Sequence, residues 1–234
     1  MTVKIMAIGG HAGDMDLTAG AALAQAVLDG HQVVMFHLTP GEKGHPTLSA
    51  AQYAEQKIRE ARQFASTIGA TTRFLEYGDG ELPVNEAVKF QVCDVIREEK
   101  PEIVITHWKN SIHKDHANTY LIVEDALFYA GIKAFDRAAP PHWVSQTYYA
   151  DNWEDPFDYN PDVFVGIRDE AYEAWLKAAS SYAYARGETG FQYLDYYRAL
   201  FVVRGRPHGF PRAEAFHRSE WSRQVRMQSL TERA

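Results

Sequence analysis

Near its N-terminus the chain reads VKIMAIGGHAGDMD, residues 3–16. The first part, Val3 to Ile8, is almost wholly apolar and predicts a strand that is buried on both faces. The glycines that follow allow a tight bend, and the Ala-rich run from Leu17 to Leu28 predicts a helix. The bend carries His11 and Asp14, which can converge on one cation. This stretch therefore predicts a strand, a loop and a helix with a polar site between them.

The rest of the chain continues to alternate between strands and helices. Further strands are predicted at 32–38, 72–77, 102–106, 143–149 and 163–167, and helices at 49–68, 85–99, 113–129, 170–185 and 191–204. Such alternation predicts an α/β fold with a mostly parallel sheet and right-handed crossovers. In doubly wound sheets the first and fourth strands commonly flank the point where strand order reverses, and ligands bind there. We therefore expect the loops after these two strands to form one crevice.

A second polar cluster, HKDH at residues 113–116, follows the predicted fourth strand. Taken alone, His11 and Asp14 fit equally a loop histidine beside a helix-capping aspartate. The shared crevice adds His116 to them, and two histidines with one carboxylate form a three-ligand zinc site that keeps a position open for water. We therefore assign His11, Asp14 and His116 as ligands of Zn²⁺, although iron or cobalt fits the same donors.

The neighbours of His116 suggest the chemistry of the site. Asp115 is expected to accept an imidazole N–H and so fix a histidine tautomer. His113 lies within a helical turn and is expected to polarise a carbonyl or stabilise an oxyanion. The sequence thus predicts metal-assisted hydrolysis of an amide or ester.

Composition limits the other classes of function. The 234 residues fit one sizeable domain, and a net charge of −7 disfavours nucleic acid as a partner. No apolar stretch approaches the length that spans a membrane, and the single cysteine rules out an internal disulfide. We expect a cytoplasmic protein with no membrane partner. The basic, aromatic residues 206–234 are expected to form a C-terminal arm after a domain at 1–205, and such an arm favours a homo-oligomer.

The two polar clusters resemble the motifs of the LmbE-like (PIG-L) family of zinc-dependent N-deacetylases. The first family motif, His-Pro-Asp-Asp-x-Glu, reads HAGDMD at 11–16, and the second, His-x-Asp-His, reads HKDH at 113–116. The likeness includes the loop at 38–44 and the turn at 79–82, and thins after residue 140. The resemblance implies a Rossmann-like, three-layer α/β/α fold. It also implies removal of an N-acyl (acetyl) group from a small N-acetylglucosamine-type amino-sugar conjugate.

Carried over residue by residue, His11, Asp14 and His116 match the metal ligands of the family. His113 matches its transition-state-stabilising histidine. The general base of the family is the first aspartate of its motif, and this chain has Gly13 at that position. We expect Gly13→Asp to raise activity if the rest of the site is intact.

Three interpretations of the missing base stay open. Another carboxylate takes its role, and Glu42 is preferred over Asp16 and Asp115 because it lies in a loop beyond an adjacent strand. Alternatively, the metal alone supports slow catalysis, since loss of a general base costs about 10²–10⁴ in rate. In the third interpretation the protein is an inactive member that binds metal and sugar. A nucleotide-binding protein is disfavoured, because the first loop lacks the Gly-x-Gly-x-x-Gly pattern.

Overall fold

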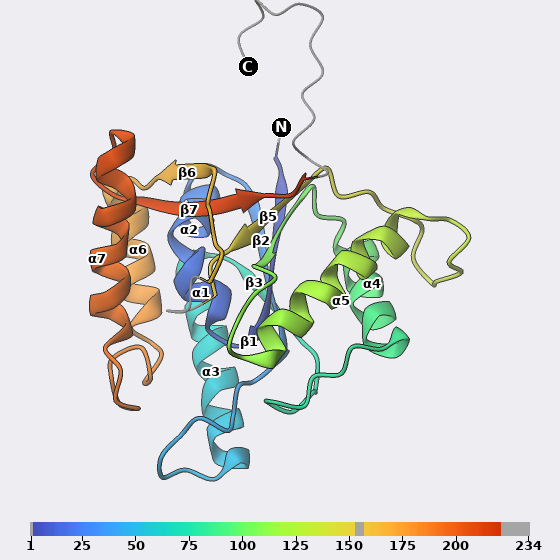
Figure 1. Cartoon of the computed structure of the whole chain (residues 1–234), viewed down its shortest axis with the longest axis horizontal. Helices are drawn as coiled ribbons and strands as arrows, with labels where there is room; N and C mark the ends of the chain where they lie inside the picture. Colours follow the sequence, from blue (N-terminus) through green and yellow to red (C-terminus); the bar gives the residue numbers. More distant parts are fainter. Residues whose placement is uncertain (1, 153–156, 221–234) are drawn as a thin grey trace, which may run out of the picture.

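The computed structural model describes residues 2–152 and 157–220. Within them, helices cover both faces of a seven-stranded sheet (Figure 1). The strands are β1 (Lys4–His11), β2 (Gln32–Thr39), β3 (Thr71–Phe74), β4 (Ile103–His107), β5 (Gln146–Ala150), β6 (Val163–Gly166) and β7 (Ala213–Arg218). The helices are α1 (Asp14–Thr18), α2 (Gly20–Leu28), α3 (Ala50–Ile68), α4 (Glu86–Glu99), α5 (Lys114–Gly131), α6 (Asp169–Ala179) and α7 (Tyr193–Gly205). A 3₁₀ turn, Arg206–His208, follows α7.

The sheet has the order β3-β2-β1-β4-β5-β7-β6. β1 pairs in parallel with both β2 and β4, and the parallel pairing continues to β3 on one side and β5 on the other. Strand order therefore reverses between β1 and β4, so the loops after them lie side by side. The predictions of a mostly parallel sheet and of its reversal point are confirmed.

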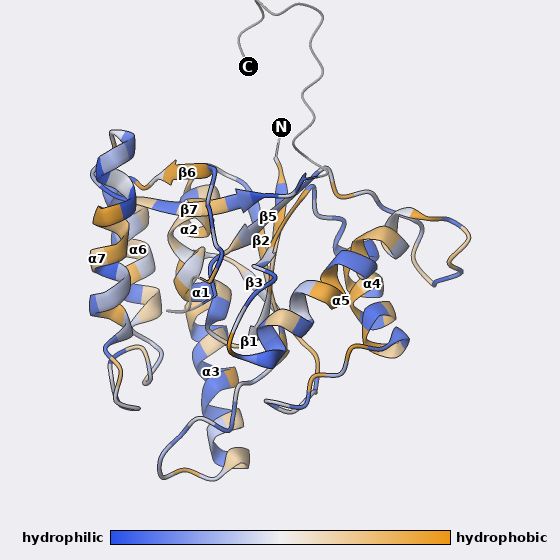
Figure 2. Ribbon diagram, in the orientation of Figure 1, coloured by the Kyte–Doolittle hydropathy of each residue, from blue (hydrophilic) through white to orange (hydrophobic). Residues whose placement is uncertain are grey.

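Two apolar cores separate the layers of the fold. On one face, α4 and α5 pack against Ile8 of β1 and Val104 of β4. On the other face, the larger core joins Ala7 of β1 to Phe64 of α3 and Trp175 of α6. Neighbouring residues of β1 thus face opposite layers, as the two-residue repeat of a strand requires. Figure 2 shows that the covering helices carry both hydrophilic and hydrophobic residues, as amphipathic helices do.

Two expectations about the elements need correction. The single helix expected at 17–28 is two helices, because the backbone leaves helical geometry at Ala19 (φ −131°). Residues 206–218 do not begin a separate arm, since β7 pairs antiparallel with both β5 and β6 inside the sheet. The end of the expected arm, residues 221–234, lies outside the described residues. None of the helices in the described part of the chain is long and apolar enough to cross a bilayer.

Candidate active site

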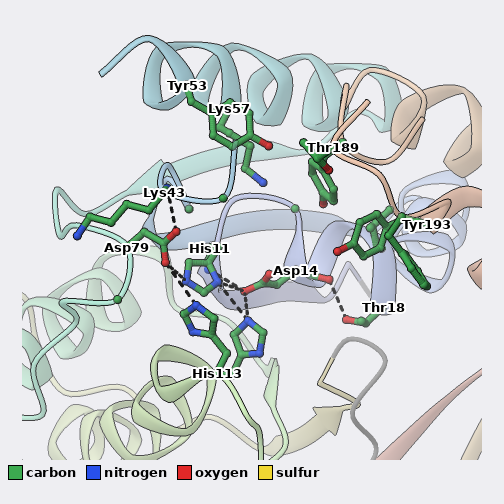
Figure 3. Close-up of a pocket in the computed structure, with 18 of the residues that line it drawn as sticks. His11, Asp14, Thr18, Lys43, Tyr53, Lys57, Asp79, His113, Thr189 and Tyr193 are labelled. Carbon is green, nitrogen blue, oxygen red and sulfur yellow. Dashed lines mark hydrogen bonds and ion pairs between the residues drawn. The ribbon is translucent and has the colours of Figure 1, made fainter. Parts of the chain in front are cut away.

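The loops after β1 and β4 bring the three predicted metal ligands together. His11 ends β1, Asp14 begins α1, and His116 lies in the first turn of α5. The Nδ1 atom of His11 lies 3.2 Å from Oδ2 of Asp14 and 3.1 Å from Nε2 of His116. The remaining separation, from Nε2 of His116 to Oδ2 of Asp14, is 3.4 Å. Figure 3 shows His11 and Asp14 facing each other at the floor of a pocket.

This triangle of donor atoms fits a tetrahedral metal ion. Zinc bonds of about 2.0–2.1 Å in tetrahedral geometry place ligand atoms about 3.3 Å apart. The three observed separations lie within 3.1–3.4 Å, so one ion can bind all three atoms with little rearrangement. Further histidines and aspartates surround these three residues. Together they form several groups that share members, and within each group the ligand atoms lie within 4.8 Å of one another. The further members are Asp79, His107, His113 and Asp115. The site is thus a buried His/Asp cluster that can hold a metal.

Two carboxylates lie beside the Nε2 atom of His11, the nitrogen that does not face Asp14 and His116. Nε2 of His11 lies 3.1 Å from Oδ1 of Asp79 and 3.4 Å from Oδ2 of Asp115. A proton on Nε2 faces these two carboxylates, which leaves the Nδ1 lone pair for the metal. Oδ2 of Asp115 also accepts a hydrogen bond from the backbone N–H of Gly80 at 2.6 Å. Asp115 thus lies beside His11, and its role in fixing a histidine tautomer stays a prediction.

Burial and charge prepare two of the predicted ligands. Burial lowers the pKa of His116 to about 4, so this imidazole is neutral at pH 7 and its lone pair is available. Burial, the largest single influence on Asp14, raises its pKa, but His116 and His11 together outweigh it and hold that pKa well below the usual range. A neutral imidazole and an ionised carboxylate are the forms that ligate a metal.

His113 presents a proton donor next to the predicted ligands. It is the N-cap residue of α5, and its Nδ1 accepts a hydrogen bond from the backbone N–H of Asp115 at 3.2 Å. Nε2 then carries the proton of the neutral ring, and it lies 3.5 Å from Oδ1 of Asp79. The rings of His113 and His11 are 4.5 Å apart between centroids. This geometry suits the stabilisation of an oxyanion near the metal.

A pocket of about 500 Å³ opens above the cluster. Its floor is the His/Asp cluster, and α3 and the segment leading into α7 supply its walls. The wall residues include Tyr53, Lys57, Tyr184, Thr189, Phe191, Tyr193 and Tyr197. The pocket thus joins a polar, metal-binding floor to an aromatic wall with one buried amine, that of Lys57.

Tyr184 takes the space next to Gly13, where the family has its general base. A Cβ atom built on Gly13 would lie 2.0 Å from the hydroxyl oxygen of Tyr184. Gly13 also has φ 108°, a conformation that side-chain-bearing residues rarely adopt. The ring of Tyr184 is held by Tyr193, with centroids 5.2 Å apart, and by the ammonium of Lys57 above its face. At this position the chain therefore has a phenol in place of a carboxylate.

The expected replacement bases lie outside the pocket. The carboxylate of Glu42 accepts hydrogen bonds from the backbone N–H of Asp79 at 3.0 and 3.2 Å, and Glu42 does not line the pocket. Asp16 is fully buried, where its Oδ1 accepts a hydrogen bond from the Tyr182 hydroxyl at 2.7 Å. Among the pocket-lining residues of the described chain, the carboxylates are Asp14 and Asp79. The role of Glu42 as a base stays a prediction.

Sequence reasoning missed three side chains of this site. Asp79 lies in the turn that carried part of the family likeness, which was a signal for it. Lys57 and Tyr184 had no such signal, because both come from segments far from the two motifs. His107 stacks on the ring of His116 at 4.3 Å, and its Nε2 accepts a hydrogen bond from the backbone N–H of Gly10.

The fold and the site together define a class of α/β proteins. Such proteins hold a metal-binding His/Asp cluster at the point where the order of parallel strands reverses. Residues 6–127, more than half of the chain, match the family model described as PIG-L, GlcNAc-PI de-N-acetylase. The chain belongs to the PIG-L family.

Known relatives include deacetylases and hydratases. The diacetylchitobiose deacetylase of Thermococcus kodakarensis is 26% identical over 223 residues, which are 90% of this chain and 81% of that protein. The 4-oxalmesaconate hydratase of Pseudomonas putida is 25% identical over 214 residues, which are 86% of this chain and 79% of that protein.

Solved structures show the same fold. The 4-carboxy-2-hydroxymuconate hydratase GalB of Pseudomonas putida has a TM-score of 0.84 and 19% identity, and the match covers 97% of this chain and 99% of that one. The N,N'-diacetylchitobiose deacetylase of Pyrococcus horikoshii has a TM-score of 0.77 and 20% identity, with 92% and 83% covered. The expected Rossmann-like, three-layer architecture is confirmed.

Proposed function

We propose that the chain is a zinc-dependent hydrolase that removes an N-acyl group from an amino-sugar conjugate of the N-acetylglucosamine type. The observation that carries this proposal is the triangle of His11 Nδ1, Asp14 Oδ2 and His116 Nε2, with the N–H of His113 beside it. The similarity to a diacetylchitobiose deacetylase supports the substrate class.

The roles of the residues follow from their positions. Zinc bound by His11, Asp14 and His116 would supply Lewis-acid chemistry, activating water and polarising the acyl carbonyl. His113 donates its Nε2 proton toward the oxygen that becomes negative in the tetrahedral transition state. Asp79 lies beside the same nitrogen, because its Oδ1 is 3.5 Å from Nε2 of His113, so the substrate oxygen would take the place of this carboxylate as the acceptor.

Tyr184 and Glu42 divide the remaining proton transfers. Burial raises the pKa of Tyr184 well above its ordinary value, so its hydroxyl stays protonated near neutral pH and does not act as the base. We assign it to protonation of the leaving amine, a step that the raised pKa makes harder and that direct contact with the amine would have to assist. The proton from the attacking water goes to Glu42, whose carboxylate first has to leave the backbone N–H of Asp79. If Glu42→Gln hydrolyses substrate at the parent rate, Glu42 is excluded as the base.

The first test is the metal content of the purified protein. We expect about one zinc ion per chain, lost in His11→Ala and in His116→Ala, because each change removes one of three ligands. His208→Ala is the matched control, since this exposed histidine lies outside the pocket. Full retention of zinc in both ligand variants would remove the assignment. Acetate release from N-acetylglucosamine conjugates then separates an enzyme from a protein that only binds metal and sugar.

A second candidate function is hydration of an unsaturated carboxylic acid. Two observations favour it. Gly13 stands where the family has its catalytic aspartate, and 86% of this chain aligns with a hydratase at 25% identity. Hydration needs a proton donor near the double bond, and the Tyr184 hydroxyl is such a donor. Assays with an unsaturated tricarboxylate, followed by loss of its conjugated absorbance, distinguish this reaction from deacetylation.

The location of the protein in the cell, its partners and its oligomeric state stay predictions. We propose a cytoplasmic enzyme with a small-molecule substrate and without nucleic acid or membrane partners. A homo-oligomer built on a basic arm has less support, because Arg212 forms an ion pair with Asp169 of the same chain.

A further inference from the structure

Lys57 is a buried amine that extends from the middle of α3 into the pocket. Only 6% of the residue is exposed, and it lines the pocket together with the metal-binding cluster. Figure 3 shows its amine pointing from α3 toward the side of the pocket that holds His11 and Asp14. Among the residues that the structure describes, no carboxylate lies within ion-pair distance of this amine.

Aromatic rings occupy part of the surroundings of the Lys57 amine. Nζ lies 4.0 Å from the ring centroid of Tyr184, 5.4 Å from that of Tyr182 and 6.0 Å from that of Tyr53. Ring faces attract a cation, but they do not replace the oxygen acceptors that three ammonium protons require. Burial lowers the pKa of Lys57, while Asp14 and Glu60 act in the opposite direction. A negative group placed in the pocket would therefore satisfy both the charge and the protons.

Lys43 provides a contrast within the same pocket. Its ammonium is exposed and lies 2.6 Å from Oε1 of Glu81, and Figure 3 shows it pointing away from the pocket. Apart from the histidines, Lys43 and Lys57 are the cationic residues among the described pocket lining. Lys57 is therefore the amine in this lining that a bound anion can reach.

We propose that Lys57 binds a carboxylate of the substrate, at the wall opposite the metal-binding floor. A carboxylate fits better than a phosphate, because one ammonium offers a single positive charge and no second free cation lies beside it in the described lining. This inference rests on the proposed metal-dependent function and narrows its substrate class. The substrate is then an acyl amino sugar that carries a carboxylate or, for a hydratase, an unsaturated acid with at least two carboxylates.

The test measures binding of simple acids to the zinc-loaded protein by titration calorimetry. Succinate, glutarate and adipate are each compared with butyrate, pentanoate and hexanoate, which have the same chain length but one carboxylate. One carboxylate of each dicarboxylate would bind at the metal. The second would reach Lys57 when the carbon chain between the two carboxylates is long enough. We expect at least one dicarboxylate to bind about tenfold more tightly than its partner, as one charged hydrogen bond allows.

Three variants locate the source of that preference. Lys57→Met keeps the length and packing of the side chain, and should abolish the preference while zinc content and monocarboxylate affinity stay unchanged. Lys57→Arg should restore part of it, and Lys43→Met should keep it, because that amine pairs with Glu81. Far-ultraviolet circular dichroism and thermal unfolding check that each variant is folded.

Two outcomes would overturn the proposal. One is equal affinity for dicarboxylates and monocarboxylates at all three lengths, and the other is a preference that survives in Lys57→Met. Because the measurement needs no turnover, a failure to release acetate does not affect it. A failure of the proposed metal site appears separately, as protein without zinc.

Discussion

At the scale of single residues, Gly13 is the departure that matters, and the structure changes what it means. The sequence alone suggests that an aspartate at this position should restore activity. The left-handed backbone and the Tyr184 hydroxyl, 2.0 Å from a built Cβ, show that a side chain does not fit there without rearrangement. Gly13 and Tyr184 therefore form one unit, and changing the glycine alone disturbs it.

We therefore predict that Gly13→Asp destabilises the protein and does not raise its activity. Strain at positive φ and the clash with the phenol should lower the free energy of unfolding by about 1–3 kcal/mol. Denaturant unfolding and a turnover assay measure the two effects. On the background Tyr184→Ala the clash is absent, so Gly13→Asp/Tyr184→Ala should lose less stability relative to Tyr184→Ala than Gly13→Asp loses relative to the parent. A single variant as stable as the parent and more active would contradict this account.

Tyr184→Phe tests the hydroxyl by itself. The ring and its contacts with Tyr193 stay, so folding and zinc content should not change. If the hydroxyl donates a proton in the reaction, kcat should fall about 10²-fold while KM changes little. Steady-state kinetics across a range of pH measures this split. An unchanged kcat would leave Tyr184 with a packing role only.

At the scale of secondary-structure elements, a side chain of β7 caps the N-terminus of α2, although the two elements are far apart in the sequence. The residue at the N-cap of α2, Ala19, offers no side-chain acceptor. Glu214 of β7 supplies it, because its carboxylate accepts hydrogen bonds from the backbone N–H groups of Ala21 (3.0 Å) and Ala22 (2.7 Å). A buried glutamate in a strand thus satisfies the start of a helix far away in the sequence.

Glu214→Ala should lower the free energy of unfolding by about 1–3 kcal/mol, because it leaves two buried amides without partners. Glu214→Gln should cost less, since its amide oxygen still accepts one hydrogen bond. Chemical denaturation measures both, and zinc content should stay at the parent level. Equal stability of the alanine variant and the parent would show that solvent replaces the carboxylate.

The elements that the sequence could not predict share a physical cause. β7 was missed because Glu214 and His217 read as polar surface, whereas long-range contacts bury them. Lys57 lies in a correctly predicted helix, but a lysine in a mixed helical pattern normally indicates the solvent side. The clustering of the three proposed metal ligands was predictable, because each lies next to a buried strand that has a clear apolar pattern. Which strands are adjacent then followed from the alternation of elements.

At the scale of the whole molecule, the proposed metal links two halves of the fold. His11 and Asp14 come from the β1–α1 region, and His116 comes from α5. The sheet lies between α1 and α5. An ion bound to all three stabilises only the folded chain.

Zinc should therefore raise the melting temperature of the protein. At a free concentration of one hundred times Kd the gain is about 2.7 kcal/mol. Thermal scans with and without zinc measure it, and a chelator should reverse it. His11→Ala should show no such rise, and the same melting temperature in the parent with and without zinc would contradict the proposed site.

The pocket as a whole is a property of the tertiary structure that local patterns do not reveal. Its floor comes from the two motifs together with Asp79 and His107, whereas its walls come from α3 and from the residues around Tyr184 and Tyr193. These walls decide which substrate fits, so the motifs indicate a reaction class more readily than a substrate.

The position of β7 between β5 and β6 also bears on the order of biosynthesis. β6 leaves the ribosome before β7, yet its sheet partner is β7, so it has to wait until two further helices have been made. During that interval β5 presents an open edge, the feature through which nascent chains pair with one another. Slow translation through α6 and α7 would prolong this exposure.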